Sequence, residues 1–87
     1  MPRYFFHVDN GVFSADPDGT ELADLAAAQA AAVTLSGEIL REKGLGFWAS
    51  GSPWRLHVTD QAHQLLFTLQ FSATVPSAPV LFRPVDP

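Results

Sequence analysis

The sequence predicts an α+β domain of ββαββ order, in which one helix packs on one face of an antiparallel four-stranded sheet. Aromatic-rich segments of alternating polarity occur near both ends of the chain, at Arg3–Val8, Trp54–Thr59 and Gln64–Ser72. Alternation with a period of two is typical of strands. An alanine-rich segment with helical spacing separates them, and an acidic loop rich in turn-forming residues precedes this segment.

The first two strands are predicted to form a hairpin. Arg3–Val8 is rich in aromatic residues, which favour strands, and the dipeptide Asn10-Gly11 that follows tolerates the positive φ angles of a tight turn. We therefore expect Val12–Ala15 to return beside the first strand. The tetrapeptide Asp16–Gly19 (DPDG) then ends the hairpin, because Pro presets one turn dihedral and Gly accepts a left-handed one.

One helix is predicted from about Leu22–Asp24 to about Lys43. Asp24 suits the N-cap position, and Gly44 suits the position just past the C-terminal end. Small alanines in the middle of its apolar stripe allow the helix to lie close to the sheet. The stripe, which is expected to face the sheet, consists of Leu25, Ala28, Ala32, Leu35 and Ile39.

The second half of the chain predicts a loop and two more strands. Phe47 and Trp48 lie in the Gly- and Ser-rich loop 45–53, and we expect their rings to cover one end of the core. Arg3–Val8 and Gln64–Ser72 are apolar on both sides, so we expect them inside the sheet, with Trp54–Thr59 at an edge that its charge protects.

The sheet face turned away from the helix is the predicted interaction face. If Tyr4, Phe6 and Val8 face the helix, alternation places aromatic, basic and polar side chains on the other side. This predicted face consists of Arg3, Phe5, His7, Arg55, His57, Leu66 and Thr68. Aromatic residues and Arg are enriched at protein interfaces, and such a face can also stack single-stranded bases. A solvated face without a special role is the third interpretation.

Length and composition indicate a single domain at residues 1–72 and a proline-rich C-terminal arm at residues 73–87. A chain of 87 residues without Cys builds a thin core and cannot use disulfides. Additional burial through self-association is therefore expected. Val80, Leu81 and Phe82 make the arm apolar, so that it can dock on its own domain or on a second subunit.

The net charge of −4 disfavours nucleic acid as a partner, because binding to a phosphate backbone needs a basic surface. No Lys or Arg lies between Arg3 and Arg41, where Asp9, Asp16, Asp18, Glu21 and Asp24 cluster. The short apolar start does not have the pattern of a signal peptide, and no window reaches the roughly 20 apolar residues of a membrane span. We expect a cytoplasmic protein without a membrane segment.

Several features occur together in this chain: the opening MPRYFFHV, the segment Asp18–Leu25 (DGTELADL), the alanine helix, and Val58–Asp60 followed by Leu65–Phe71. In this combination they resemble a family of small bacterial proteins with a domain of unknown function, over residues 1–71. The resemblance implies no catalytic residue. Where such proteins often have Gly in the turn after Asp60, this chain has Gln61-Ala62-His63. A weaker resemblance, at the level of fold, is to antitoxin domains of the HicB kind.

No residue is predicted to be catalytic, and no cofactor is expected. Cys is absent, and no Gly-x-Ser-x-Gly motif occurs. The loop Asp16–Gly19 has acidic residues in an EF-hand-like order, but the last ligand position of that template falls on Leu25, so a turn is the better interpretation. His7, His57 and His63 are weak metal candidates, because no carboxylate completes a recognisable ligand spacing.

These observations predict a small non-enzymatic interaction module that self-associates as a homodimer, through the sheet face or the C-terminal arm. A first alternative is a HicB-antitoxin-like regulator whose acidic loop masks a basic protein partner. A second alternative is a metal-binding or enzymatic domain, which the sequence supports least.

Overall fold

The computed structural model describes residues 1–49 and 53–84. The elements in chain order are β1 (Arg3–Asp9), β2 (Phe13–Ser14), β3 (Thr20–Glu21), α1 (Leu25–Lys43), α2 (Gly46–Ala49), β4 (Trp54–Thr59) and β5 (Leu65–Phe71). The predicted loop 45–53 and the predicted arm 73–87 therefore lie partly outside the described residues. Within the described part, none of the helices is long and apolar enough to cross a membrane.

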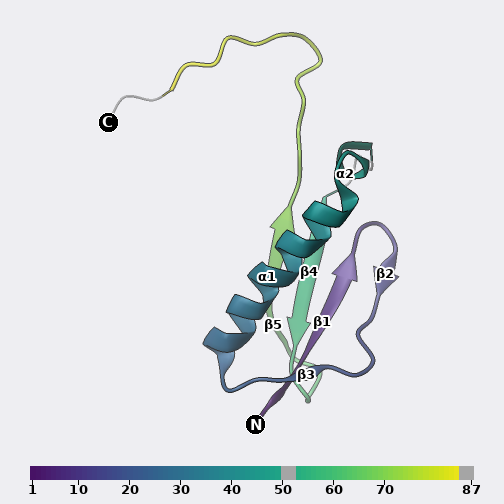
Figure 1. The fold of residues 1–87 in the computed structure, drawn as a ribbon, viewed down its shortest axis with the longest axis vertical. Coiled ribbons are helices and arrows are strands. Elements are labelled where there is room, and N and C mark those ends of the chain that lie inside the picture. The colour runs from purple at the N-terminus through teal and green to yellow at the C-terminus, as the bar shows by residue number, and fades with distance from the viewer. Residues whose placement is uncertain (50–52, 85–87) are drawn as a thin grey trace.

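The strands form one antiparallel sheet, and α1 covers one of its faces (Figure 1). The strand order is β2-β1-β4-β5, with β3 paired to the opposite end of β1. Register runs from Phe5 opposite Thr59 to Asp9 opposite Arg55 between β1 and β4. The predicted α+β class is confirmed, with one short strand more than the predicted ββαββ order.

β3 is the strand that the sequence does not predict. It is two residues long and pairs Glu21 with Arg3 and Thr20 with Tyr4. The N–H of Leu22 prolongs this contact by donating to the carbonyl of Pro2 at 3.0 Å. Two residues cannot show an alternation of polarity, so no periodic signal in the sequence marks this strand.

β2 is shorter than the predicted Val12–Ala15, because the hairpin turn holds the first of these residues. The carboxylate of Asp9 accepts a hydrogen bond from the N–H of Gly11, and the side-chain oxygen of Asn10 accepts one from the N–H of Val12, both at 3.1 Å. Gly11 has a φ of 100°, a left-handed value that favours glycine. Pairing with β1 therefore starts only at Phe13.

The predicted positions of the last two strands in the sheet are wrong: β4 is interior, and β5 forms an edge. β4 alternates strictly, with Trp54, Leu56 and Val58 buried and its polar residues half-buried on the other side. The apolar residues on both sides of β5 do not reflect burial, since Leu65 is 60% exposed and Leu66 is 37% exposed. β5 is therefore an apolar strand at the edge of the sheet, where part of it is exposed to solvent.

Capping residues set both ends of α1. The carboxylate of Asp24 accepts a hydrogen bond from the N–H of Ala27 at 2.9 Å, which confirms the predicted N-cap. At the other end the N–H of Gly44 donates to the carbonyl of Leu40 at 3.0 Å. Leu25, which was predicted to face the sheet, is 46% exposed, because the first turn of α1 lies beside the sheet and not over its centre (Figure 1).

The core lies between α1 and the two central strands. Ala28 and Ala32 are completely buried against Tyr4, Leu56 and Val58, as the small side chains of the helical stripe predict. The half-buried residues around this centre are Phe6, Val8, Leu22, Leu35, Phe67 and Leu69. The residues expected to face the helix are thus the ones that pack against it.

Of the two rings predicted to cover one end of the core, only Phe47 does so. Its ring stacks on Phe71 at a centroid distance of 6.0 Å, and Phe71 stacks on Trp54 at 6.1 Å. The ammonium of Lys43 lies 5.4 Å from the centroid of the Trp54 ring. Trp48 is 57% exposed, because neighbouring residues of the short helix α2 point about 100° apart.

We expect the substitution Ala32→Leu to lower the free energy of unfolding by about 1–3 kcal/mol, because a larger side chain overpacks the buried stripe. Urea denaturation followed by circular dichroism measures this change. Ala30→Leu places the same side chain on an exposed part of α1, where a change within about 0.5 kcal/mol is expected. Equal effects of the two substitutions would contradict close contact between α1 and the sheet.

Candidate interaction surface

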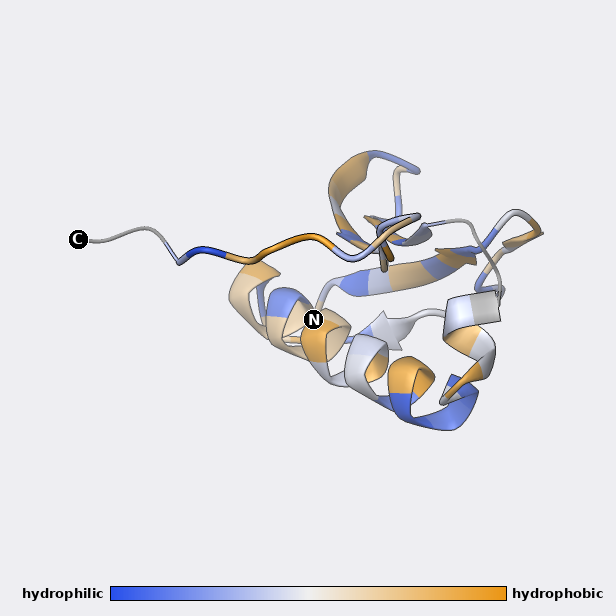
Figure 2. Cartoon of the chain, turned by 90° about the horizontal axis from the view of Figure 1, so that it is seen from above, coloured by the Kyte–Doolittle hydropathy of each residue, from blue (hydrophilic) through white to orange (hydrophobic). Residues whose placement is uncertain are grey.

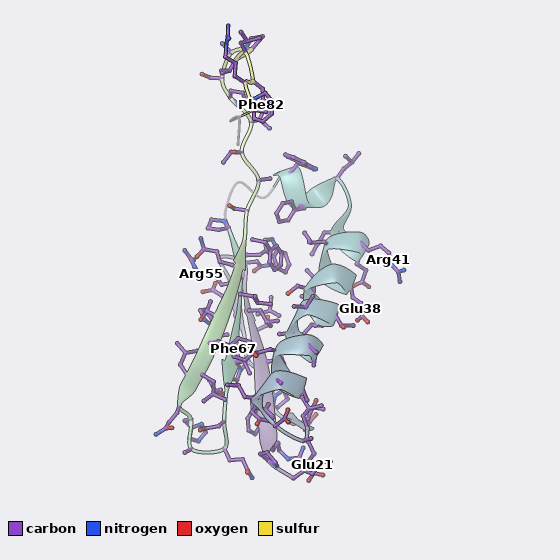
Figure 3. All side chains as sticks on the ribbon, turned by 90° about the vertical axis from the view of Figure 1, so that its left-hand side faces the viewer. Glu21, Glu38, Arg41, Arg55, Phe67 and Phe82 are labelled. Carbon is purple, nitrogen blue, oxygen red and sulfur yellow. The ribbon has the colours of Figure 1, made fainter. Side chains whose placement is uncertain are left out.

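The predicted interaction face lies on the side of the sheet opposite α1, which we call the open face. Tyr4 is buried under α1, so its neighbours Arg3 and Phe5 point away from the helix. His7 lies directly opposite His57 in the register. His57 in turn lies opposite Thr68. Figure 3 shows the side chain of Arg55 on this side of the sheet, away from α1.

Leu66, the remaining member of the predicted face, occupies an irregular position. Val58 pairs with Phe67 and Thr59 with Leu65, so that β5 has one more residue than β4 at this point. Leu66 is this extra residue. A bulge of this kind bends the strand and interrupts the ladder, and it leaves Leu66 partly exposed at the end of the open face.

Three stacked rings cover one half of the open face. Phe5 and His7 stack with a centroid distance of 6.4 Å and an interplanar angle of 6°. Phe13, from β2, also stacks with His7, at 5.7 Å. The imidazole of His7 is therefore in contact with two phenyl rings and is half-buried.

Hydrogen bonds fix the protonation pattern of His7. The backbone N–H of Asp16 donates to Nδ1 of His7 at 3.0 Å, so this nitrogen carries no proton. Nε2 then carries the proton of the neutral ring and donates to Oγ1 of Thr59 at 2.9 Å. Both ring nitrogens are engaged, which leaves neither available to ligate a metal in this arrangement.

The carboxylate of Asp16 organises the loop between β2 and β3. Its Oδ1 accepts hydrogen bonds from the N–H groups of Asp18 and Gly19, at 3.2 and 3.1 Å. Its Oδ2 accepts one from the N–H of Phe6 in β1, at 3.1 Å. The sequence predicts a turn at this position, but it contains no signal that the turn binds β1.

These contacts also set the ionisation of Asp16. Partial burial is the largest single influence and opposes ionisation, but hydrogen bonds from the N–H groups of Gly19, Phe6 and Asp18 favour the charged form. A positive charge on the nearby imidazole of His7 acts in the same direction. Together they outweigh burial, so the pKa of the Asp16 carboxyl lies below its ordinary value.

Gly19 approaches the open face more closely than any other residue type could. A Cβ atom at this position would lie 2.8 Å from Cε2 of Phe5 and 2.9 Å from Cγ of Arg3. Its φ of 71° is also left-handed. The loop Asp16–Gly19 is therefore packed against the side chains of β1 and covers part of the open face.

Most other polar groups of the open face are paired across strands. Arg55 Nε donates to Oε1 of Gln70 at 3.0 Å, and Nδ1 of His57 lies 2.9 Å from Oγ1 of Thr68. Nε2 of His57 is 3.9 Å from a carboxylate oxygen of Asp9. The polar side chains at the centre of the open face therefore bond to one another, and a partner protein is not required to satisfy them.

The third histidine lies apart from the pair formed by His7 and His57. His63 is in the turn between β4 and β5, where its N–H donates to the carbonyl of Asp60. Its φ of 63° is the left-handed value that a Gly would adopt without strain. Within residues 1–49 and 53–84, no group of three His, Cys, Asp or Glu side chains is placed so that it could hold a metal ion.

The acidic residues that cluster in the sequence serve local structure. Glu21 forms an ion pair with Arg3 at 3.2 Å, and Arg3 also donates to the carbonyl of Asp18 at 2.9 Å. Asp9 and Asp24 accept backbone hydrogen bonds in the hairpin turn and at the helix N-cap. The cluster thus reflects caps and turns along one stretch of chain.

The edge of the sheet at β5 is the strongest candidate for a contact surface. Within the described chain, β5 pairs only with β4, so its other side presents unpaired backbone N–H and C=O groups. Its seven residues, LLFTLQF, include no charged residue and no proline. The opposite border of the sheet is different, because β2, the Asp16 loop and β3 line the outer side of β1.

An apolar groove runs between α1 and β5. Its volume is about 370 Å³, and its lining residues are Val33, Ser36, Gly37, Leu40, Leu69, Gln70 and Phe71. The hydroxyl of Ser36 is buried and has no hydrogen-bond partner within residues 1–49 and 53–84. A second groove of about 320 Å³ lies on the other flank of α1, above Phe6 and beside Glu38.

The described part of the C-terminal arm lies away from the domain. Val80, Leu81 and Phe82, the predicted arm residues, are between 72% and 83% exposed. Figure 2 shows this apolar stretch of the arm in orange, and Figure 1 shows that the arm lies beyond the end of the sheet. In Figure 3 the labelled Phe82 lies beyond the end of the sheet.

Over the described residues, the geometry defines a small α+β domain whose sheet has one face covered by α1, one open face and a seven-residue unpaired edge at β5. The chain belongs to a family known by this domain: residues 3–72 match the domain of unknown function DUF6894. The predicted resemblance to such a family is confirmed to that extent. No curated protein and no solved structure matches the chain.

We expect Gly19→Ala to lower the free energy of unfolding by about 2 kcal/mol or more, because the residue combines a left-handed φ with contact against the Phe5 ring. Gly37→Ala is the matched control, since a Cβ there meets nothing within 4 Å. At this helical position the same substitution should stabilise the protein by up to about 1 kcal/mol. Chemical denaturation distinguishes the two signs.

Asp16→Asn should lower the free energy of unfolding at neutral pH by about 1–3 kcal/mol, because its amide can no longer accept all three backbone hydrogen bonds. The folded-state pKa of Asp16 is lowered, so its stabilising effect is complete above the ordinary pKa of Asp and is lost as pH falls through the lowered value. Denaturation curves across this acidic range should therefore converge for wild type and variant. Curves that stay parallel would contradict this role of Asp16.

Proposed function

We propose that the protein is a small interaction module without enzymatic activity, which self-associates as a homodimer through the unpaired edge of β5. The single observation that carries this proposal is the composition of that edge. Edge strands in soluble proteins are usually protected by charge, proline, brevity or a covering segment. β5 has seven uncharged residues, and its first two, Leu65 and Leu66, are exposed.

The size of the core supports the same proposal. The fully buried centre consists of two alanines on α1 and a few side chains on β1 and β4. Small domains with thin cores gain stability from oligomerisation. Pairing at β5 would extend the sheet, satisfy its free backbone groups and cover the exposed leucines in one step.

The antitoxin-like alternative needs acidic side chains that are free to meet a basic partner. Asp16 and Asp24 accept backbone hydrogen bonds, and Glu21 is paired with Arg3. The acidic cluster therefore has a structural explanation already. The metal-binding alternative is likewise less favoured, because the ring nitrogens of His7 are both engaged.

We expect Leu66→Lys to raise the dissociation constant of the dimer by at least about tenfold, because a charge at the strand edge opposes pairing. Leu66 is partly exposed, so the variant should still fold. Val12→Lys adds the same charge at a position that is 72% exposed, in the hairpin turn at the opposite border of the sheet, and it should leave association unchanged.

Light scattering coupled to size-exclusion chromatography, together with analytical ultracentrifugation, measures these dissociation constants. A wild-type protein that stays monomeric at about 1 mM would contradict the proposed self-association. A Val12→Lys variant as impaired as Leu66→Lys would contradict the assignment of the contact to β5.

A further inference from the structure

We propose that the segment Val80–Arg83 of one copy adds as a strand to the β5 edge of a second copy, with Val80 and Phe82 inserted into the groove between α1 and β5. This inference rests on the proposed self-association and names the segment that makes the contact. Strand addition of this kind combines main-chain hydrogen bonds with pockets for alternate side chains.

The arm has the composition of an added strand at this point. Val80–Arg83 is a stretch of four residues between Pro79 and Pro84 in which each residue keeps its backbone N–H. Val80, Leu81 and Phe82 are apolar and uncharged, and in the described structure they are almost fully exposed. Such exposure of three consecutive apolar residues is unfavourable in a monomer, and docking removes it.

The apolar lining of the groove suits the side chains that this segment would direct toward it. In a strand, Val80 and Phe82 point to one side and Leu81 to the other. A strand placed beside β5 would direct one of these sides toward α1, where the groove of about 370 Å³ is lined by Val33, Leu40, Leu69 and Phe71. Both surfaces are apolar, and their contact buries area on each side.

Ser36 provides an independent observation at the same place. It lines the groove and is 8% exposed, and its hydroxyl has no hydrogen-bond partner among the described residues. A buried hydroxyl without a partner destabilises the folded state. An occupant that brings a polar group into the groove would satisfy it, which an apolar ligand alone would not.

The occupant is assigned to a second copy because of the direction of the arm. The arm leaves β5 along the direction of the strand and then bends to the side beyond the end of the sheet, clear of the β5 edge of its own domain (Figure 1). Pro76 and Pro79 favour extended backbone, which opposes the reversal that docking on the same chain requires. Ten residues, Ala73–Phe82, reach up to about 33 Å when extended, comparable with the 35 Å intermediate extent of the molecule.

Two variants of the full chain test the arm and the groove separately. Phe82→Ser removes the aromatic ring of the inserted segment, at a position that is exposed in the single chain. Gly37→Leu fills the groove from α1, at a position where a Cβ has open space. Neither should impair folding, since Leu has a higher helix propensity than Gly. Each should raise the dissociation constant of the dimer by at least about tenfold.

The controls are Val75→Ser, on the arm but outside the inserted segment, and Ala30→Leu, on an exposed part of α1. Both should leave the dissociation constant within about threefold of wild type. If Phe82→Ser and Gly37→Leu also leave it unchanged while Leu66→Lys disrupts the dimer, the arm inference is overturned and the proposed function stands. If wild type is monomeric, both are overturned.

A mixing experiment tests whether the arm acts in the second copy. In a mixture, the intact arm of the Gly37→Leu copy can enter the intact groove of the Phe82→Ser copy, whereas each variant alone has no productive contact. Native mass spectrometry resolves the two masses and should detect a heterodimer at concentrations where neither variant forms a homodimer. A mixture that contains only monomers would overturn the assignment to a second copy.

Discussion

The hydrogen bond between the Asp16 carboxylate and the Phe6 N–H is the contact on which the N-terminal half of the structure depends. β2 and β3 each pair with only two residues of β1, and Asp16 fills the gap between them. The same carboxylate closes the turn that brings Gly19 against the Phe5 ring. One side chain thus replaces a missing stretch of strand and positions the two short strands on either side of it.

This loop also determines where α1 begins. β3 holds the chain beside Arg3, and Asp24 then caps a helix whose alanines rest on Tyr4 and Val58. Because Ala28 and Ala32 are small, α1 lies close to the central strands and leaves a groove on each flank. The small alanines thus account both for the close packing at the centre and for the grooves at the sides. One of these grooves is the proposed docking site beside β5.

Much of the fold follows from patterns that the sequence displays. Alternation predicted which residues of β1 meet the helix, and Asp24 and Gly44 predicted its ends. The order of the strands did not follow, because an apolar edge and an interior strand have the same composition. The open face was predicted residue by residue, but its cross-strand pairs and the bond from Asp16 to β1 depend on register, which only three-dimensional pairing fixes. Loop residue Gly19 was predicted for its turn, not for its contact with Phe5.

The two borders of the sheet are unlike, and this difference limits how large an assembly can grow. On the side of β1, two-residue strands and a carboxylate occupy the backbone groups, so another chain finds no continuous ladder there. A subunit with only one long open border does not stack on both sides into a continuous sheet, as a fibril requires. In the proposed dimer, the arm of each copy on the β5 edge of the other closes the pair with twofold symmetry, so that the uncharged edge does not lead to open-ended polymerisation.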